Sequence, residues 1–222
     1  MRAGQRLVGQ DGKEVMLFPL SYMYISQGEG GSYSHAGTYN IDFLGYGENG
    51  VVYNCPYYAP CSCTCVWAGG SDNIRIFQSD NEVHRGDGTV GYATFLFMHD
   101  NNPIASVGDR FQQGELIGHT GTAGNVTGDH VHFNTAKGQY AGTHYVPPDN
   151  NYELVGSTHI YDICYVNDTT LVQDYGYNWR TYSGGYDPTL ITKKRKFKWI
   201  LYANKLRNER NNSYWHFIYN MI

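Results

Sequence analysis

Two histidines stand one residue apart in the stretch Gly-Asp-His-Val-His-Phe, which runs from residue 128 to residue 133. In a β-strand, residues i and i+2 project from the same face, roughly 6–7 Å apart, so the rings of His130 and His132 would face the same place. One ring could bind a metal ion while the other moves a proton beside it. A surface strand with two spare histidines explains the pair equally well, so the rest of the chain must decide.

Three further side chains could complete a metal site. Asp42 lies between Ile41 and Phe43, and a carboxylate between two large apolar residues of a strand is costly unless it is paired or bound to a metal. His35 precedes it in a loop rich in glycine and serine, and His99 ends a hydrophobic run. Each signal alone has an ordinary structural explanation. Together they predict a zinc site, which needs about three protein ligands and one open position for water.

The other histidines fit a metal site less well. They lie in a charged turn, in a turn after Ile-Gly, in the polar part of the chain after residue 140, or near the C-terminal end: His84, His119, His144, His159 and His216. We interpret all five as non-ligands, with His144 the least clear.

Five cysteines offer a different metal site. They are Cys55, Cys61, Cys63, Cys65 and Cys164, and their odd number and tight cluster do not resemble a secreted disulfide framework. The spacing C-x5-C-x-C-x-C leaves a zinc knuckle open, but it lacks the usual C-x2-C pairs. We therefore favour buried, reduced cysteines in strands.

The elements that must position these residues are predicted to be strands. Gly (27) and Tyr (21) are abundant and charged residues make up 16% of the chain, which favours a β-rich, loop-rich globular protein over a helical bundle or a disordered chain. Short β-prone runs broken by glycine follow one another to about residue 165, and none has a convincing helical period. A length of 222 residues suits one domain with a small appendage.

We expect an N-terminal lead-in over residues 1–19, a β-rich domain over 20–165 and a polar, basic extension over 166–222. Residues 193–210 hold eight Lys or Arg and one Glu, so the remaining chain has a formal charge of −11 within a total of −4. The last 26 residues could form a terminal helix. A poorly packed extension is favoured over a cationic segment that binds an anionic polymer or a partner protein. No recognisable nucleic-acid-binding fold is present, so we expect no nucleic-acid partner.

Targeting segments are not expected. No run of apolar residues is long enough to cross a bilayer, and the first 18 residues lack the apolar stretch of a secretory signal peptide. The sequence therefore predicts neither a membrane span nor a signal peptide.

From about residue 20 to residue 162 the chain resembles the lysostaphin-type zinc metalloendopeptidases, the family that cuts peptides in bacterial peptidoglycan. The segment VGDRFQQGELIGHTGTAGNVTGDHVHF is similar to the family signature of Val-Gly-Asp, Gly-x-x-Ile-Gly, Thr-Gly pairs and His-x-His-Phe. The segment ISQGEGGSYSHAGTYNIDF resembles the part that carries the first histidine and the aspartate. YYAPCSCTCVWAGG resembles the strand pair that follows, and FMHD stands at the family's Tyr-x-His-Leu strand end.

The resemblance implies a mainly β fold, with the antiparallel β-sheet or sandwich of the lysostaphin-type peptidases, called a duplicated hybrid motif. It implies one Zn²⁺ per chain, held by His35, Asp42 and His132. His99 and His130 would then be the catalytic pair beside the attacking water. One of them would act as general base, and both could orient or stabilise the tetrahedral intermediate.

Tyr33 is a candidate for a phenolic hydrogen bond near the oxyanion. Three departures from the family pattern concern loop geometry. The gap between the first histidine and the aspartate is longer than in the shortest family form, Cys63 stands where the family often has glycine, and Asp100 follows the histidine of the strand end. None of the three removes a ligand or a proton-transfer group, so they bear on substrate preference more than on activity.

Peptidoglycan lies outside the bacterial membrane, so an enzyme without an export signal needs another route. We predict a phage lysin, either carried on the virion tail or released as an endolysin from the host cytoplasm to the cell wall. Its expected partners are peptidoglycan peptides and, on a virion, other phage tail proteins. The alternative is a catalytically silent family member that serves as a structural or wall-binding module. Such members usually lose a ligand, and this chain keeps all five positions.

Overall fold

The computed structural model describes residues 1–147 and 151–190. Met1–Tyr186 form one compact unit, and a second unit begins at Asp187. The basic segment, the expected terminal helix and His216 lie outside the described residues. Residues 166–186 belong to the first unit. The division of the chain at residues 19 and 165 stays a prediction.

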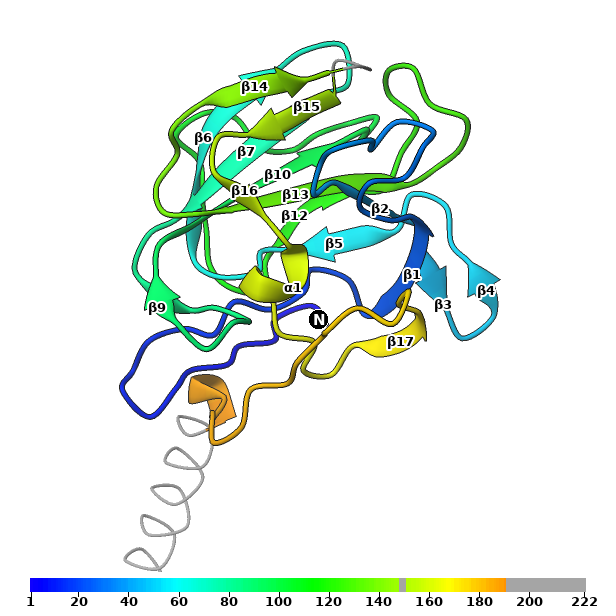
Figure 1. The fold of residues 1–222 in the computed structure, drawn as a ribbon. Coiled ribbons are helices and arrows are strands. Elements are labelled where there is room, and N and C mark those ends of the chain that lie inside the picture. The colour runs from blue at the N-terminus through cyan, green and yellow to red at the C-terminus, as the bar shows by residue number, and fades with distance from the viewer. Residues whose placement is uncertain (148–150, 191–222) are drawn as a thin grey trace, which may run out of the picture. The chain divides into compact units, whose positions relative to one another are not determined.

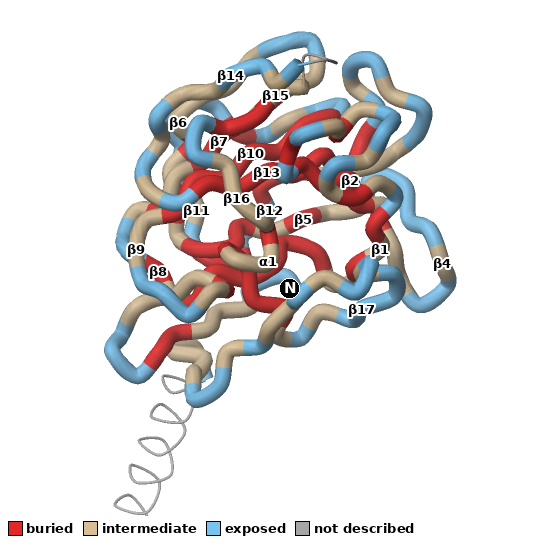
Figure 2. The backbone as a smooth tube through the Cα atoms, in the orientation of Figure 1, coloured by how far each residue is buried: buried red, intermediate tan, exposed pale blue. Residues whose placement is uncertain are grey.

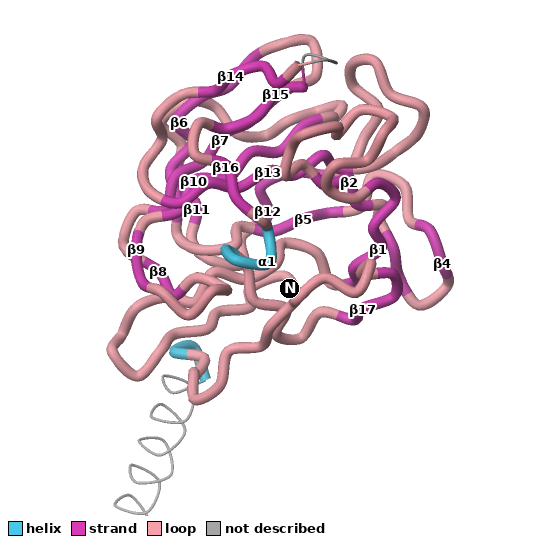
Figure 3. The backbone as a smooth tube through the Cα atoms, in the orientation of Figure 1, coloured by secondary structure: helices cyan, strands magenta, loops and turns pink. Residues whose placement is uncertain are grey.

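The described residues are mostly strands and loops (Figure 3). In chain order the elements are β1 (Tyr22–Gln27), β2 (Ile41–Phe43), β3 (Tyr46–Gly47), β4 (Gly50–Val51), β5 (Pro56–Tyr58), β6 (Cys63–Gly69), β7 (Ile74–Ser79), β8 (Val83–His84), β9 (Val90–Gly91), β10 (Ala93–Met98), β11 (Arg110–Phe111), β12 (Leu116–His119), β13 (Val131–Lys137), β14 (Thr143–Val146), β15 (Asn151–Leu154), β16 (Ser157–Thr158), α1 (Ile160–Ile163) and β17 (Thr170–Gln173). The prediction of a mainly β protein is confirmed. Within the described ranges, no helix combines the length and the apolar character that a membrane span requires.

Nine strands of the described chain form one sheet, in the order β11-β6-β7-β10-β13-β2-β1-β17, with β16 beside β13 (Figure 1). Its neighbouring strands are antiparallel apart from β1 and β17, which are parallel. The other strands form two-stranded pairs: β3 with β4, β5 with β12, β8 with β9, and β14 with β15. The parallel pair joins a strand near the start of the domain to one beyond residue 165, a contact that the sequence did not predict.

Side chains of the sheet alternate between two apolar clusters. In β10, Phe95 and Phe97 lie in the large core, where Phe97 stacks on Phe133 with ring centroids 4.7 Å apart. Leu96 and Met98 lie in a smaller cluster formed by the other set of side chains. This period of two is that of a strand with both faces covered. All six residues of β10 are buried, and Figure 2 draws this strand in the colour of buried residues. The centre of the sheet is therefore packed on both faces.

The same alternation positions the two central site residues. Ile41 and Phe43 of β2 belong to the large core, so Asp42 between them faces the opposite side. In β13, Phe133 belongs to that core and His132 faces the opposite side. The register places His132 directly opposite Asp42 on neighbouring antiparallel strands. Core packing therefore brings a carboxylate and an imidazole together.

Candidate metal centre

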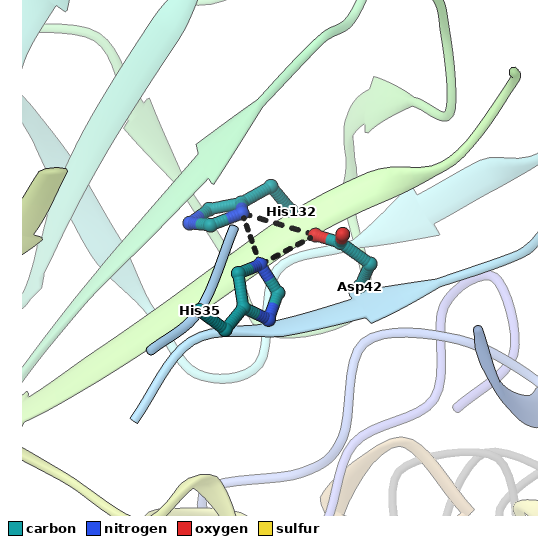
Figure 4. A group of neighbouring side chains, drawn as sticks. All are labelled: His35, Asp42 and His132. Atoms are coloured by element: carbon teal, nitrogen blue, oxygen red, sulfur yellow. Dashed lines mark hydrogen bonds and ion pairs between the residues drawn. The ribbon is translucent and has the colours of Figure 1, made fainter. Parts of the chain in front are cut away.

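Three side chains from separate segments converge on one point: His35 from the loop after β1, Asp42 of β2 and His132 of β13 (Figure 4). The Nε2 atom of His35 lies 3.3 Å from Nδ1 of His132. The Oδ1 atom of Asp42 lies 3.3 Å from the first of these nitrogens and 3.0 Å from the second. Within residues 1–147 and 151–190, no other group of His, Cys, Asp or Glu could hold a metal in this way.

The size of this triangle fits a zinc ion. Zinc takes nitrogen and oxygen ligands at about 2.0–2.2 Å in a tetrahedral arrangement, which puts neighbouring ligand atoms about 3.3–3.5 Å apart. The observed separations of 3.0–3.3 Å are close to that spacing. Two imidazoles and one carboxylate are also a ligand set that zinc accepts. These three residues could therefore hold a metal ion.

Hydrogen bonding directs the correct nitrogen of His35 into the triangle. Its Nδ1 lies 3.2 Å from the carbonyl oxygen of Gly28, to which it donates. A neutral imidazole carries one proton, so Nε2 keeps its lone pair. That nitrogen is the one that faces Asp42 and His132.

The electrostatics favour the charge states that a metal requires. Burial raises the pKa of Asp42, but the neighbouring imidazoles of His132 and His35 outweigh it and hold the pKa well below the usual value for a carboxyl. Burial lowers the pKa of His132, although Asp42 opposes this. At neutral pH the centre therefore presents an ionised carboxylate and an unprotonated His132 ring, as metal ligation demands.

His99 and His130 stand beside the triangle. Their ring centroids lie 4.7 Å apart, and the ring of His99 lies 5.9 Å from that of His132. The Nε2 atom of His130 lies 3.6 Å from Oδ1 of Asp42. The structure therefore brings together all five histidine and aspartate residues that the sequence singled out, although their roles stay predictions.

Backbone carbonyls fix the tautomers of these two rings. Nδ1 of His99 donates to the carbonyl of Ala123 and Nδ1 of His130 donates to that of Gly128, each at 2.8 Å. The Nε2 atoms are thus the ones able to accept a proton. Burial lowers the pKa of His99 to about 4, with a further contribution from neighbouring imidazoles, so this ring is neutral at neutral pH.

His99 has an unusual backbone. Its φ of 80° lies in the left-handed region that side-chain-bearing residues rarely adopt. Its N–H donates to the carbonyl of Asp72, and its own carbonyl accepts from the N–H of Ala123. A Cβ atom built on Gly121 would collide with the carbonyl oxygen of His99. The glycine allows the loop after β12 to hold the strained residue.

A cleft of about 760 Å³ opens over the centre. Asp42, His132, His99 and His130 line it, together with polar and aromatic side chains. Its lining includes one further carboxylate, Asp72, and, within the described residues, no Lys or Arg. Such a cleft is suited to an uncharged or cationic substrate.

Tyr33 also lines this cleft, at its rim, where the side chain is 76% exposed. Nothing in its position fixes the phenolic hydroxyl over the metal centre. The predicted part of Tyr33 in oxyanion stabilisation stays a prediction.

Two of the other histidines, and the cysteines, have different surroundings. His84 pairs with Asp11 at 2.9 Å, and His159 pairs with Glu29 at 2.7 Å. All five cysteines are free, and none belongs to a metal-binding group of the described residues. Four of them are fully buried, and burial raises the pKa of their thiols: Cys61, Cys63, Cys65 and Cys164. They act as small apolar residues of the core.

The chain matches no protein-family model. Morphogenesis protein 1 of Bacillus phage B103 is 43% identical over 174 residues, which cover 78% of this chain and 46% of that protein. The chain thus spans less than half of that relative's length.

Two solved structures are similar at a lower level. A zinc-containing peptidase from Vibrio cholerae has a TM-score of 0.40 and 14% identity, covering 66% of this chain and 44% of that chain. The catalytic domain of lysostaphin from Staphylococcus simulans has a TM-score of 0.40 and 22% identity, covering 62% and 85%. Similarities of this size do not place the chain in a family.

Proposed function

We propose that this chain is a zinc-dependent endopeptidase that hydrolyses peptide bonds in bacterial peptidoglycan. The convergence of His35, Asp42 and His132, with two further imidazoles beside them in an open cleft, carries the proposal. The resemblance of residues 20–162 to the lysostaphin-type metalloendopeptidases supports the substrate class.

One zinc ion would be held by Nε2 of His35, Oδ1 of Asp42 and Nδ1 of His132. When bound, zinc lowers the pKa of water to about 7 and acts as a Lewis acid toward developing negative charge on oxygen. Three protein ligands are characteristic of catalytic zinc sites, whereas structural sites have four. The number of ligands therefore favours a catalytic site.

His99 and His130 would move the protons of the reaction. Each ring has its Nδ1 proton committed to a carbonyl, so its Nε2 atom can accept a proton from a water molecule in the cleft. The resulting imidazolium can donate to the leaving amine. We assign one ring as general base and the other as an orienting group, with Tyr33 as a further hydrogen-bond donor to the oxyanion.

We also propose a bacteriophage origin, with a lysin that is either part of the virion tail or an endolysin that reaches the wall from the host cytoplasm. The similarity to Morphogenesis protein 1 of Bacillus phage B103 supports the origin. On a particle, the partners would be peptidoglycan peptides and other phage tail proteins.

Mass spectrometry of the muropeptides released from purified walls of several bacteria tests the proposal. We expect the protein loaded with about one zinc ion per chain to release peptides from the walls. The masses of these products should identify the bond that is cut. The variants H132A and D42A should lose both zinc and activity, whereas H130A should keep zinc and lose turnover. His84→Ala is the matched control, because His84 pairs with Asp11 outside the cleft.

Two results would contradict the assignment. Zinc-loaded protein that sediments with walls but releases no peptide from any of them would favour the silent wall-binding module. Normal hydrolysis by H130A would show that His130 is not required for proton transfer.

A further inference from the structure

The loop that carries His35 is held by a distant segment of the chain. β17 pairs with β1, the strand that leads into this loop. Tyr175 and Tyr177 lie two and four residues beyond the end of β17, and they contact the loop at Gly28. We call these two residues the tyrosine brace.

The brace packs against a residue that has no side chain. A Cβ atom built on Gly28 would lie 2.8 and 2.9 Å from ring atoms of Tyr175, and it would collide with the hydroxyl of Tyr177. The same hydroxyl accepts a hydrogen bond from the N–H of Glu29, at 3.1 Å. The absence of a side chain on Gly28 therefore allows both rings to approach the backbone.

The N–H of Glu29 and the carbonyl of Gly28 belong to one planar peptide unit. Tyr177 accepts from the N–H of this unit, and the carbonyl accepts from Nδ1 of His35 at 3.2 Å. The peptide plane cannot rotate without breaking one of these hydrogen bonds. Each bond also polarises the unit and strengthens the other. The hydroxyl of Tyr177 is thus two hydrogen bonds away from the imidazole of His35.

The brace is itself anchored to the large core. The ring of Tyr177 lies 5.5 Å from that of Tyr161, which lies 5.8 Å from Trp179. Trp179 in turn packs edge-on against Phe18 of the core, at 5.8 Å. The peptide unit is therefore tied to the rigid part of the domain.

A second contact holds Glu29 through its side chain. His159 donates to the carboxylate of Glu29 at 2.7 Å, and its ring stacks on Tyr161 at 4.6 Å. Tyr161 thus packs against both the histidine that holds Glu29 and the tyrosine that accepts from its N–H.

We infer that Tyr177 is a positioning residue for the metal ligand His35, acting through the peptide unit of Gly28 and Glu29. The segment beyond residue 165 is then part of the metal centre. The inference rests on the proposed function, because it gives Tyr177 a part in the affinity for zinc. Tyr177 neither binds the metal nor takes part in proton transfer.

Tyr177→Phe tests the inference, because it removes the hydroxyl and keeps the ring. We expect the zinc dissociation constant, measured by competition with a chelator, to rise at least about threefold, less than the roughly 10- to 100-fold typical when a direct partner of a ligand is lost. The unfolding midpoint of the metal-free protein should stay within error of wild type. Tyr182→Phe is the matched control, since Tyr182 lies in the same segment and its hydroxyl approaches His84.

Gly28→Ala is the second variant, because its methyl group would displace the brace and rotate the peptide unit. Nitrogen-15 NMR of the metal-free proteins should show the His35 proton on Nδ1 in wild type and in Tyr182→Phe. It should show a mixture of tautomers in Tyr177→Phe and Gly28→Ala. Zinc affinities and tautomers equal to wild type in both variants would overturn the inference. Failure of wild type to bind zinc would overturn the proposed function instead, and the NMR comparison would still decide the inference.

Discussion

At the scale of single residues, the centre depends on side chains held by backbone groups. Carbonyls of Gly28, Ala123 and Gly128 each accept from an Nδ1 atom and so direct an imidazole Nε2 atom inward. His99 has in addition a left-handed backbone. The position of the His99 ring therefore depends on the loop after β12, which contacts the His99 carbonyl.

Gly121→Ala should disturb His99 without removing a ligand. The added methyl group would collide with the carbonyl oxygen of His99 and shift its ring. A displacement of about 1 Å at a catalytic group can cost on the order of 100-fold in rate, so we expect a drop in kcat of that size. Zinc content should stay at wild type. Steady-state peptide hydrolysis measures the effect, and Gly47→Ala, where a methyl group meets only an ordinary contact, is the control. Wild-type turnover in G121A would show that the loop does not position His99.

At the scale of elements, strand alternation sorts the core from the site. In β2 and in the first three residues of β13, successive residues alternate between the large core and the metal centre. The register that pairs Asp42 with His132 is fixed because a shift of one residue would move Phe43 and Phe133 out of the core. A change of this register would separate Asp42 from His132 and so disrupt the metal centre.

Phe133→Ala should lower the free energy of unfolding of the domain. The side chain is fully buried and stacks on Phe97. Loss of a buried phenylalanine costs about 3–5 kcal/mol of unfolding free energy, because apolar contacts are lost and a cavity remains. Urea unfolding of the metal-free protein measures this. Val51→Ala, at a residue that is 49% exposed, should change the free energy by less than about 0.5 kcal/mol. A loss below about 1 kcal/mol in F133A would mean that β13 is not held by this stacking.

The sequence predicted the parts of this arrangement whose signals are local. The carboxylate between Ile41 and Phe43, and the two histidines at a spacing of two, followed from strand alternation. The sequence did not predict the residues that hold the loop of His35 in place, because these residues make contacts across long distances in the chain. Glu29 and Tyr177 are 148 positions apart, and no spacing or composition signal joins them. The parallel pairing of β17 with β1 was missed for the same reason.

At the scale of the whole molecule, Met1–Tyr186 form one unit that contains the metal centre, the cleft and the tyrosine brace. Residues beyond the expected boundary at 165 supply a strand of the main sheet and aromatic packing behind the loop of His35. We therefore expect the segment through residue 186 to be needed for full zinc affinity.

The most direct test of the central claim is anomalous X-ray diffraction at the zinc absorption edge, from crystals of the zinc-loaded protein. The account predicts one anomalous peak per chain, within about 2.0–2.2 Å of Nε2 of His35, Oδ1 of Asp42 and Nδ1 of His132. A crystal without a peak at that position, or with its zinc held by other residues, would contradict it.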